Sequence, residues 1–288
     1  MTLNAFNTLP QREAADQLKI CCGAEKWVKE MMQSFPFSDE QSLVKRAADC
    51  WYNTCTEADW REAFTHHPKI GDVRSLTEKF ASTQHLAGDE QASVNKASAS
   101  VIEGLAEANK AYESKFGFIF IVCAAGRSAE EMLRLLNDRL NNNVDEELQI
   151  AMGEQFKITV LRFKKIITDG DWSAIKGSRL TTHVLDTSLG KPGAGITVRL
   201  RKKTGNAWQT FAQGITDSDG RVSDLLPPQR KLDPETYKIV FETAAYFETL
   251  KIKGFYPEVE IQFSVVDDSH YHVPLLINPF GYSTYRGS

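Results

Sequence analysis

Several side chains in the second half of this sequence can transfer protons or bind anions. Imidazoles exchange protons near neutral pH, and guanidinium groups hold polarised oxygens through paired N–H donors. Such groups could activate a water molecule and stabilise the oxyanion that forms when a ring amide is hydrolysed. A single histidine on a strand is more often an ordinary hydrogen-bonded residue than a catalytic one. The residues of this set are His183, Arg221, His272, Tyr285, Arg286, Gly287 and Ser288.

The first half contains a second set of polar residues, spread over four segments. In "FTHHPKIGD", His67 precedes Pro68 at an expected helix end, where the proline restricts its conformation. "AGDEQASV" contains Glu90 and Gln91, and the segment "KFGFIFIVCAAGR" contains an unusually apolar run from Phe116 to Ala125. The fourth segment, "EQFKITVLRF", places Arg162 away from the apolar stripe of its expected helix.

The elements expected to position the first-half set are helices. Residues 101–116 have apolar side chains at steps of three and four, which is typical of an amphipathic helix. Ser128 followed by Glu131 is a capping-box pattern that predicts a helix start. The apolar positions Met152, Phe156, Val160, Phe163 and Ile167 predict one buried stripe on a last long helix.

The apolar period changes from helical to alternating after a short polar segment. Residues 169–178 contain glycine and polar residues and are predicted to form a linker. Alternation then appears in the segments 196–200, 259–265 and 271–277, which are separated by turn signals such as "DSDG". We therefore predict an all-α domain over residues 1–168 and an antiparallel β-sandwich over residues 179–288.

Composition restricts the class of protein and the partners to be expected. The net charge is −4, and no dense basic block favours nucleic acid as a partner. No apolar run reaches the roughly 20 residues that a membrane helix needs, and no secretory leader is evident. The five cysteines have no zinc-like spacing, so we expect reduced thiols, no metal and an intracellular protein.

The β half resembles 5-hydroxyisourate hydrolase, the transthyretin-related family of urate degradation. The resemblance lies in "RLTTHVLDTSLGKPGAGITVRL", "TDSDGR" and "YHVPLLINPFGYSTYRGS", and it covers about residues 179–288. It implies a transthyretin-like fold that assembles as a tetramer. It also implies His183, Arg221, His272 and the terminal Tyr285-Arg286-Gly287-Ser288 as the site, with no cofactor.

The α half resembles 2-oxo-4-hydroxy-4-carboxy-5-ureidoimidazoline (OHCU) decarboxylase through "HPKIGD" and "FGFIFIVCAAGR", over about residues 10–168. This family decarboxylates its substrate without a cofactor. The resemblance implies His67 as the catalytic histidine and Glu90 as its acidic partner. One departure is Ala87, where members commonly have serine. The implied substrate ligands are Pro68, Gln91, Arg162 and the wall formed by Phe118, Ile119, Phe120, Ile121 and Val122.

Together the halves resemble an allantoin synthase-type fusion, which converts 5-hydroxyisourate through OHCU to (S)-allantoin. The expected partners are therefore small purine-degradation substrates and further copies of the chain, without nucleic acid or membrane insertion. One alternative is a transthyretin-like binding or scaffold protein with little catalysis. Another is a metal-dependent amidohydrolase that uses the histidines. We expect a cytoplasmic protein, with the peroxisome as the alternative, although no Arg-Leu-x5-His-Leu pattern is present.

Overall fold

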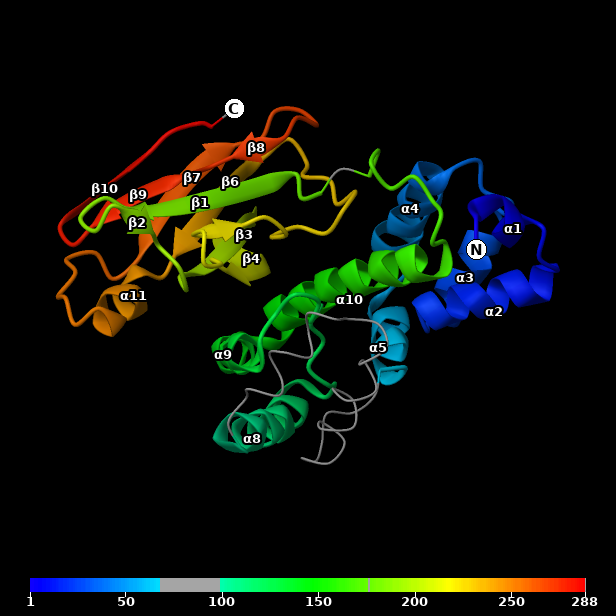
Figure 1. Ribbon diagram of the computed structural model, residues 1–288, viewed down its shortest axis with the longest axis horizontal. Helices are drawn as coiled ribbons and strands as arrows, with labels where there is room; N and C mark the ends of the chain where they lie inside the picture. The colour runs from blue at the N-terminus through cyan, green and yellow to red at the C-terminus, as the bar shows by residue number, and fades with distance from the viewer. Residues whose placement is uncertain (68–98, 176, 288) are drawn as a thin grey trace. The chain divides into compact units, whose positions relative to one another are not determined.

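The chain divides into two units, Met1–Trp172 and Ser173–Ser288. The structure is a computed structural model that describes residues 1–67, 99–175 and 177–287. Figure 1 shows helices in the first unit and strands with one short helix in the second. The division lies within residues 169–178, which contain Trp172, whose indole N–H donates to the carbonyl of Ile167 at 3.3 Å.

The described part of the first unit is helical, which confirms the predicted all-α class. Ser128 and Glu131 form the predicted capping box at the start of α9. The helix predicted over residues 101–116 is α8, which begins two residues earlier. The elements are α1 (Leu3–Asn7), α2 (Gln11–Cys21), α3 (Glu25–Met32), α4 (Glu40–Asp49), the π-helical turn η1 (Cys50–Thr54), α5 (Glu57–Thr65), α8 (Ala99–Phe116), α9 (Ala129–Arg139) and α10 (Val144–Ile166).

The long helix α10 is the centre of this unit, because it contacts α2, α5 and α8 (Figure 1). Its apolar stripe packs as expected: Trp27 stacks on Phe163, and the Trp51 indole donates to the Met152 carbonyl at 3.0 Å. The burial is wider than the single predicted stripe, because neighbours cover several faces of the helix. Polar residues of α10 are therefore buried as well, namely Glu147, Glu154, Gln155, Lys157 and Thr159.

The second unit is the predicted β-sandwich. One sheet has the order β10-β9-β1-β2, with β5 and β8 also paired to β1, and the other has the order β4-β3-β6-β7. The sandwich is not purely antiparallel, in contrast to the prediction, because β1 runs parallel to β8 and β9. The strands are β1 (Leu180–Asp186), β2 (Lys191–Pro192), β3 (Thr197–Thr204), β4 (Ala207–Ile215), β5 (Arg221–Val222), β6 (Thr236–Phe241), β7 (Val259–Ser264), β8 (Tyr271–His272), β9 (Leu275–Asn278) and β10 (Gly281–Thr284), and α11 (Thr243–Thr249) lies between β6 and β7.

The core of the sandwich lies between the two sheets and is built by alternation. In β1, every second residue from Leu180 to Asp186 is buried, so the residues between them face away from the core. The same alternation buries Tyr271, Val273, Leu275 and Ile277, as predicted. Within the described residues, no helix is both long enough and apolar enough to cross a membrane.

Candidate functional site

β1 is the strand around which the predicted polar residues of the second unit gather. Thr181 and His183 are two residues apart and point to the same face, away from the core. In the pairing register, Arg221 of β5 lies opposite His183, and His272 of β8 lies opposite Thr181. Since opposite residues of paired strands share a face, His183, Arg221 and His272 come together on one side of the sheet.

The turn before β5 brings Arg221 into this position. The Asp217 carboxylate accepts hydrogen bonds from the backbone N–H groups of Asp219 and Arg221, both at 2.9 Å. Gly220 has a φ of 73°, and a Cβ atom there would lie 2.3 Å from the Val184 carbonyl oxygen. Only glycine fits this turn without strain. The "DSDG" signal thus places Arg221 beside His183 through a specific turn.

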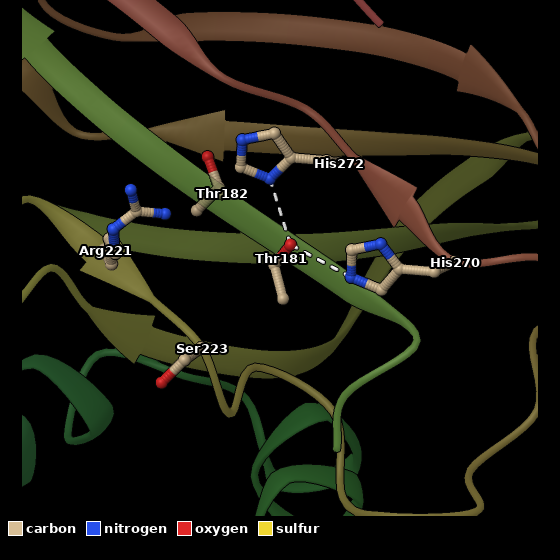
Figure 2. A pocket seen from close by; sticks show the side chains of 6 residues that line it. All are labelled: Thr181, Thr182, Arg221, Ser223, His270 and His272. Carbon is tan, nitrogen blue, oxygen red and sulfur yellow. Dashed lines mark hydrogen bonds between the residues drawn. The ribbon is translucent and has the colours of Figure 1, made fainter. Parts of the chain in front are cut away.

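A hollow of about 260 Å³ opens between these strands (Figure 2). Two of its residues, Arg221 and His272, were predicted from the sequence, whereas His183 is half-buried nearby and does not line it. The sequence prediction missed Thr181, Thr182, Ser223 and His270, which complete the lining. Alternation could have identified two of them, because Thr181 and His270 each lie two residues before a predicted histidine.

His272 lies among several cationic or potentially cationic groups. Burial lowers the pKa of His272 below its ordinary 6.5; hydrogen bonding to the Thr181 backbone opposes this shift, and the neighbouring His270, Arg221 and His183 add to it. A lowered pKa keeps the imidazole neutral near pH 7. A neutral imidazole can accept a proton from water, as a general base must.

The described part of the C-terminal tail is attached to the same histidine. The Gly287 N–H donates to the His272 carbonyl at 2.9 Å, as an isolated bridge between strands. The guanidinium of Arg286 lies 5.5 Å from the centre of the Tyr271 ring, and the Tyr285 side chain is 60% exposed. His272, Tyr285 and Arg286 help to line a second hollow, of about 330 Å³. His272 therefore borders two hollows, and the tail lines one of them.

In the first unit, His67 is held by a buried glutamine of α10. The His67 Nε2 and Gln155 Oε1 atoms are 2.5 Å apart, and Gln155 is fully buried. The Gln155 amide N–H donates to the Thr159 hydroxyl at 3.4 Å, and this hydroxyl donates to backbone carbonyls, including that of Cys21 at 3.4 Å. This arrangement orients the amide oxygen of Gln155 toward the imidazole, and because an amide oxygen only accepts, His67 Nε2–H is the hydrogen-bond donor in this contact.

Arg162 continues the same face of α10, one turn beyond Thr159. It donates to the carbonyls of Ile20 at 2.9 Å and Cys21 at 3.2 Å. Burial lowers the pKa of Arg162, although Cys21 and Cys22 oppose the shift. A hollow of about 640 Å³ adjoins this guanidinium and is lined by Asp16, Lys19, Ile20, His66, Arg162, Lys165 and Ile166. Its basic residues could bind an anion.

The predicted wall from Phe118 to Val122 belongs to no helix or strand. Phe118, Phe120 and Ile121 are buried, and Ile119 and Val122 are half-buried. Beyond its end, the Cys123 N–H donates to the buried Glu154 carboxylate at 2.8 Å. Glu154 and Gln155 are consecutive in α10, so this helix holds both the end of the wall and His67.

A buried ionic cluster supports the middle of the wall. The Arg139 guanidinium donates to the Ile121 carbonyl at 2.8 Å and forms an ion pair with Glu147 at 2.5 Å. Asn142 and Tyr112 also donate to the Glu147 carboxylate, from the Asn142 amide at 2.7 Å. Burial opposes the charge on Arg139, but Glu147, Tyr112 and Glu154 together outweigh it and raise the pKa of Arg139. The sequence prediction did not include Arg139 or Glu147.

Some predicted site residues lie outside the described part of the chain. They are Pro68, Glu90, Gln91 and Ser288, together with Ala87. Within the described ranges, no cluster of three or more His, Cys, Asp or Glu side chains is arranged to hold a metal ion. Burial raises the pKa of the Cys21 and Cys22 thiols to about 12, so neither is a thiolate near neutral pH.

Comparison with known proteins identifies relatives for each unit and for the whole chain. The OHCU decarboxylase family model matches residues 7–164, and the HIUase/Transthyretin family model matches residues 180–287. The chain is 36% identical to the "Uric acid degradation bifunctional protein TTL" of Arabidopsis thaliana, over 95% of this chain and 98% of that protein. It is 44% identical to the 5-hydroxyisourate hydrolase of Salmonella dublin, over 38% of this chain and 80% of the relative. A crystal structure of OHCU decarboxylase in the presence of (S)-allantoin is 42% identical, covers 54% of this chain and 99% of that chain, and has a TM-score of 0.45.

Proposed function

This chain belongs to the family of bifunctional uric acid degradation proteins, and from that membership we propose the reaction of each unit and the residues responsible. The second unit hydrolyses 5-hydroxyisourate to OHCU, and the first decarboxylates OHCU to (S)-allantoin. The observation that supports this most strongly is that the similarity to the bifunctional relative covers 95% of the chain and so spans both units.

In the β unit, we assign the activation of water to His272. As the neutral base, it takes a proton from the water molecule that attacks the ring carbonyl. Arg221 or Arg286 stabilises the oxyanion that develops, since guanidinium N–H groups are fixed donors that cannot lose their charge. The ring C–N bond then breaks, and its nitrogen takes up a proton that His183 or His272 can return. The register that places Arg221 opposite His183 and His272 opposite Thr181 supports this assignment.

In the α unit, the substrate loses CO₂ and the electron pair that remains is delocalised into the neighbouring imine. His67 delivers a proton to one face of that carbanion, which sets the handedness of the product. Gln155 fixes His67 through the 2.5 Å contact with its Nε2 atom. The basic hollow beside Arg162 supports the role of this residue in anchoring the polar oxygens of the substrate. Glu90, Gln91 and Pro68 complete the site in this proposal.

Self-association through the β unit is part of the proposal, with a homotetramer as the expected form. Large apolar side chains are exposed on or beside the edge strand β10, including Phe280 at 76% and Tyr282 at 43%. An open sheet edge with exposed aromatic residues favours association with another chain. Sedimentation equilibrium would test the number of subunits. We place the enzyme in the cytosol, with the peroxisome as the alternative that cell fractionation would detect.

A coupled assay tests both activities at once. The protein, treated with a strong chelator, is added to urate that urate oxidase is oxidising, while ultraviolet absorbance and circular dichroism are followed. We expect faster decay of the hydroxyisourate band and accumulation of optically active allantoin. His67→Asn should abolish decarboxylation and leave ring opening intact, and His272→Asn should slow ring opening by about 10²–10⁴-fold.

The outcomes of this assay separate the alternatives. If the chain does not accelerate either step, it is a binding or scaffold protein and the proposal is wrong. If activity disappears with the chelator and returns with added metal, the histidines serve a metal-dependent hydrolase instead. Decarboxylation that persists in His67→Asn would contradict the role of that histidine, whereas ring opening would still be attributed to the β unit.

A further inference from the structure

The Thr181 hydroxyl lies between two imidazole rings on the outer face of β1. Its oxygen is 2.9 Å from His272 Nδ1 and 3.1 Å from His270 Nε2. Figure 2 shows the two contacts as dashed lines that meet at the Thr181 hydroxyl oxygen, with Arg221 apart from them at the left of the view. Neither Thr181 nor His270 has a role in the proposed hydrolysis so far.

A hydroxyl has a single hydrogen, so it can donate to only one of the two rings. If both rings are neutral and both hydrogen bonds are made, the other ring must donate its N–H to the hydroxyl oxygen. One arrangement places a proton on His270 Nε2 and leaves His272 Nδ1 bare. In the other, His272 Nδ1 has the proton and His272 Nε2 is free to act as a base. The tautomers of the two histidines are therefore coupled through Thr181.

We propose that His270, Thr181 and His272 form a proton relay that removes the positive charge from His272 after it has accepted a proton from water. The proposal rests on the function assigned to His272 above. Water first gives a proton to His272 Nε2. His272 Nδ1–H then passes its proton to the Thr181 oxygen, and the Thr181 hydroxyl hydrogen moves to His270 Nε2. His272 ends neutral and His270 ends as the imidazolium. The reverse transfer returns the proton for the leaving nitrogen.

The surroundings of the two rings favour this direction of transfer. His272 is half-buried and faces the potentially cationic His183 and the cationic Arg221, so a positive charge on it is opposed. His270 is exposed, so water can solvate its positive charge. Moving the proton through the Thr181 hydroxyl thus transfers the positive charge from a crowded position to the solvent boundary. His272 becomes neutral and keeps on Nε2 the proton that it later gives to the leaving nitrogen.

The relay predicts a specific pattern of effects on ring opening. Thr181→Val removes the hydroxyl at nearly constant volume and should lower kcat by about 10²-fold, within the range of positioned acid–base groups. Thr181→Ser keeps a hydroxyl and should stay within a few-fold of the unchanged protein. His270→Gln keeps a hydrogen-bonding group but cannot accept the proton, so it should resemble Thr181→Val. The double variant should be no slower than either, because the residues act as one unit.

Two further measurements distinguish a relay from a structural role. ¹⁵N chemical shifts of the imidazoles should show that Thr181→Val changes the tautomer of His270 as well as that of His272. Added imidazole buffer should partly restore the kcat of His270→Ala. Thr187→Val is the matched control: it removes another threonine hydroxyl just beyond β1, which bonds the Ile277 carbonyl at 3.0 Å, and should leave ring opening unchanged.

The relay is overturned if Thr181→Val and His270→Gln open the ring as fast as the unchanged protein. It is also overturned if the tautomer of His270 is the same with and without the substitution at Thr181. Such a result would leave the proposed function intact, since the unchanged chain would still open the ring. A chain that fails to accelerate ring opening in the first place would instead contradict the proposed function. The ¹⁵N shifts would still report whether the two rings are coupled.

Discussion

Gly287→Ala tests whether the C-terminal tail belongs to the ring-opening site. A Cβ atom on Gly287 would lie 2.3 Å from His272 Cδ2, about 1.1 Å closer than the 3.4 Å at which ordinary contact begins. Forcing an extra methyl group into a packed position costs about 1–3 kcal/mol. Releasing the tail loses the hydrogen bond from Gly287 to His272, with a net cost of about 0.5–1.5 kcal/mol. It also returns backbone entropy of about 1–2 kcal/mol per residue.

Release of the tail therefore costs less free energy than forcing the methyl group into place. We expect it to lower activity much more than stability. We expect the free energy of unfolding to change by less than about 1 kcal/mol. Ring opening should fall by about 10²-fold, because Arg286 and Tyr285 are no longer held beside His272 and a donor to the oxyanion is lost. Urea denaturation and the hydroxyisourate decay rate measure the two quantities, and decarboxylation is the internal reference.

Gly281→Ala is the matched control within the same tail. A Cβ atom there would meet only the Asn278 amide, at 3.5 and 3.6 Å, so we expect unchanged ring opening. The reasoning about the tail is refuted if Gly287→Ala opens the ring at the normal rate while the backbone amide at the substituted position exchanges rapidly with solvent. A loss of more than about 3 kcal/mol in unfolding free energy would instead refute the expectation that the tail moves aside.

Two more predictions follow from charges in the two units. Arg139→Met should lower the free energy of unfolding of the α unit by about 3–5 kcal/mol, because Glu147 would remain buried without its partner. By contrast, Lys19→Met removes an exposed pair with Glu25 and should leave the free energy of unfolding nearly unchanged, and equal losses for the two variants in urea denaturation would contradict this. Because the folded pKa of His272 lies below 6.5, the midpoint of the decline of kcat/KM for ring opening on acidification should lie below pH 6.5, and a midpoint above 6.5 would contradict the assignment. The unfolded chain binds this proton first, so the stability contributed by His272 is present above pH 6.5 and is lost as the pH falls through the folded pKa.

The positions in the fold of the residues proposed for the β site could largely be predicted from the sequence, because local rules determine them. Alternation determines which residues of β1 face outward, and the turn before β5 is readable from Gly220. The register that sets Arg221 opposite His183 depends on that turn and on the buried alternate residues of each strand. Thr181 was missed because threonine is common in strands. Its role appears only when two histidines from a distant segment lie on either side of its hydroxyl.

The α site was harder to predict, because its supports are charged residues far apart in the sequence. Arg139, Glu147 and Glu154 lie off the apolar stripes of their helices, and such residues are expected at the surface. They are buried because each finds a partner that no periodicity reveals, such as the Ile121 carbonyl for Arg139. The helical period could identify α10 but not the number of its faces that neighbours would cover. Gln155 was not among the predicted site residues, whereas in the structure it holds His67.

The two sites also differ in what a single substitution can disturb. Most of the residues proposed for ring opening lie on strands whose outward side chains are replaceable without loss of the core, so a variant there should report chemistry more than stability. The residues proposed for decarboxylation depend on α10, where the groups that hold His67 and the wall are themselves buried, so a variant there should change stability and activity together. Because the described residues of the two sites belong to separate units, each activity is the control for the other. A substitution in α10 that abolished ring opening would therefore have to act through an assembly of the two units, and not through the chemistry of either site.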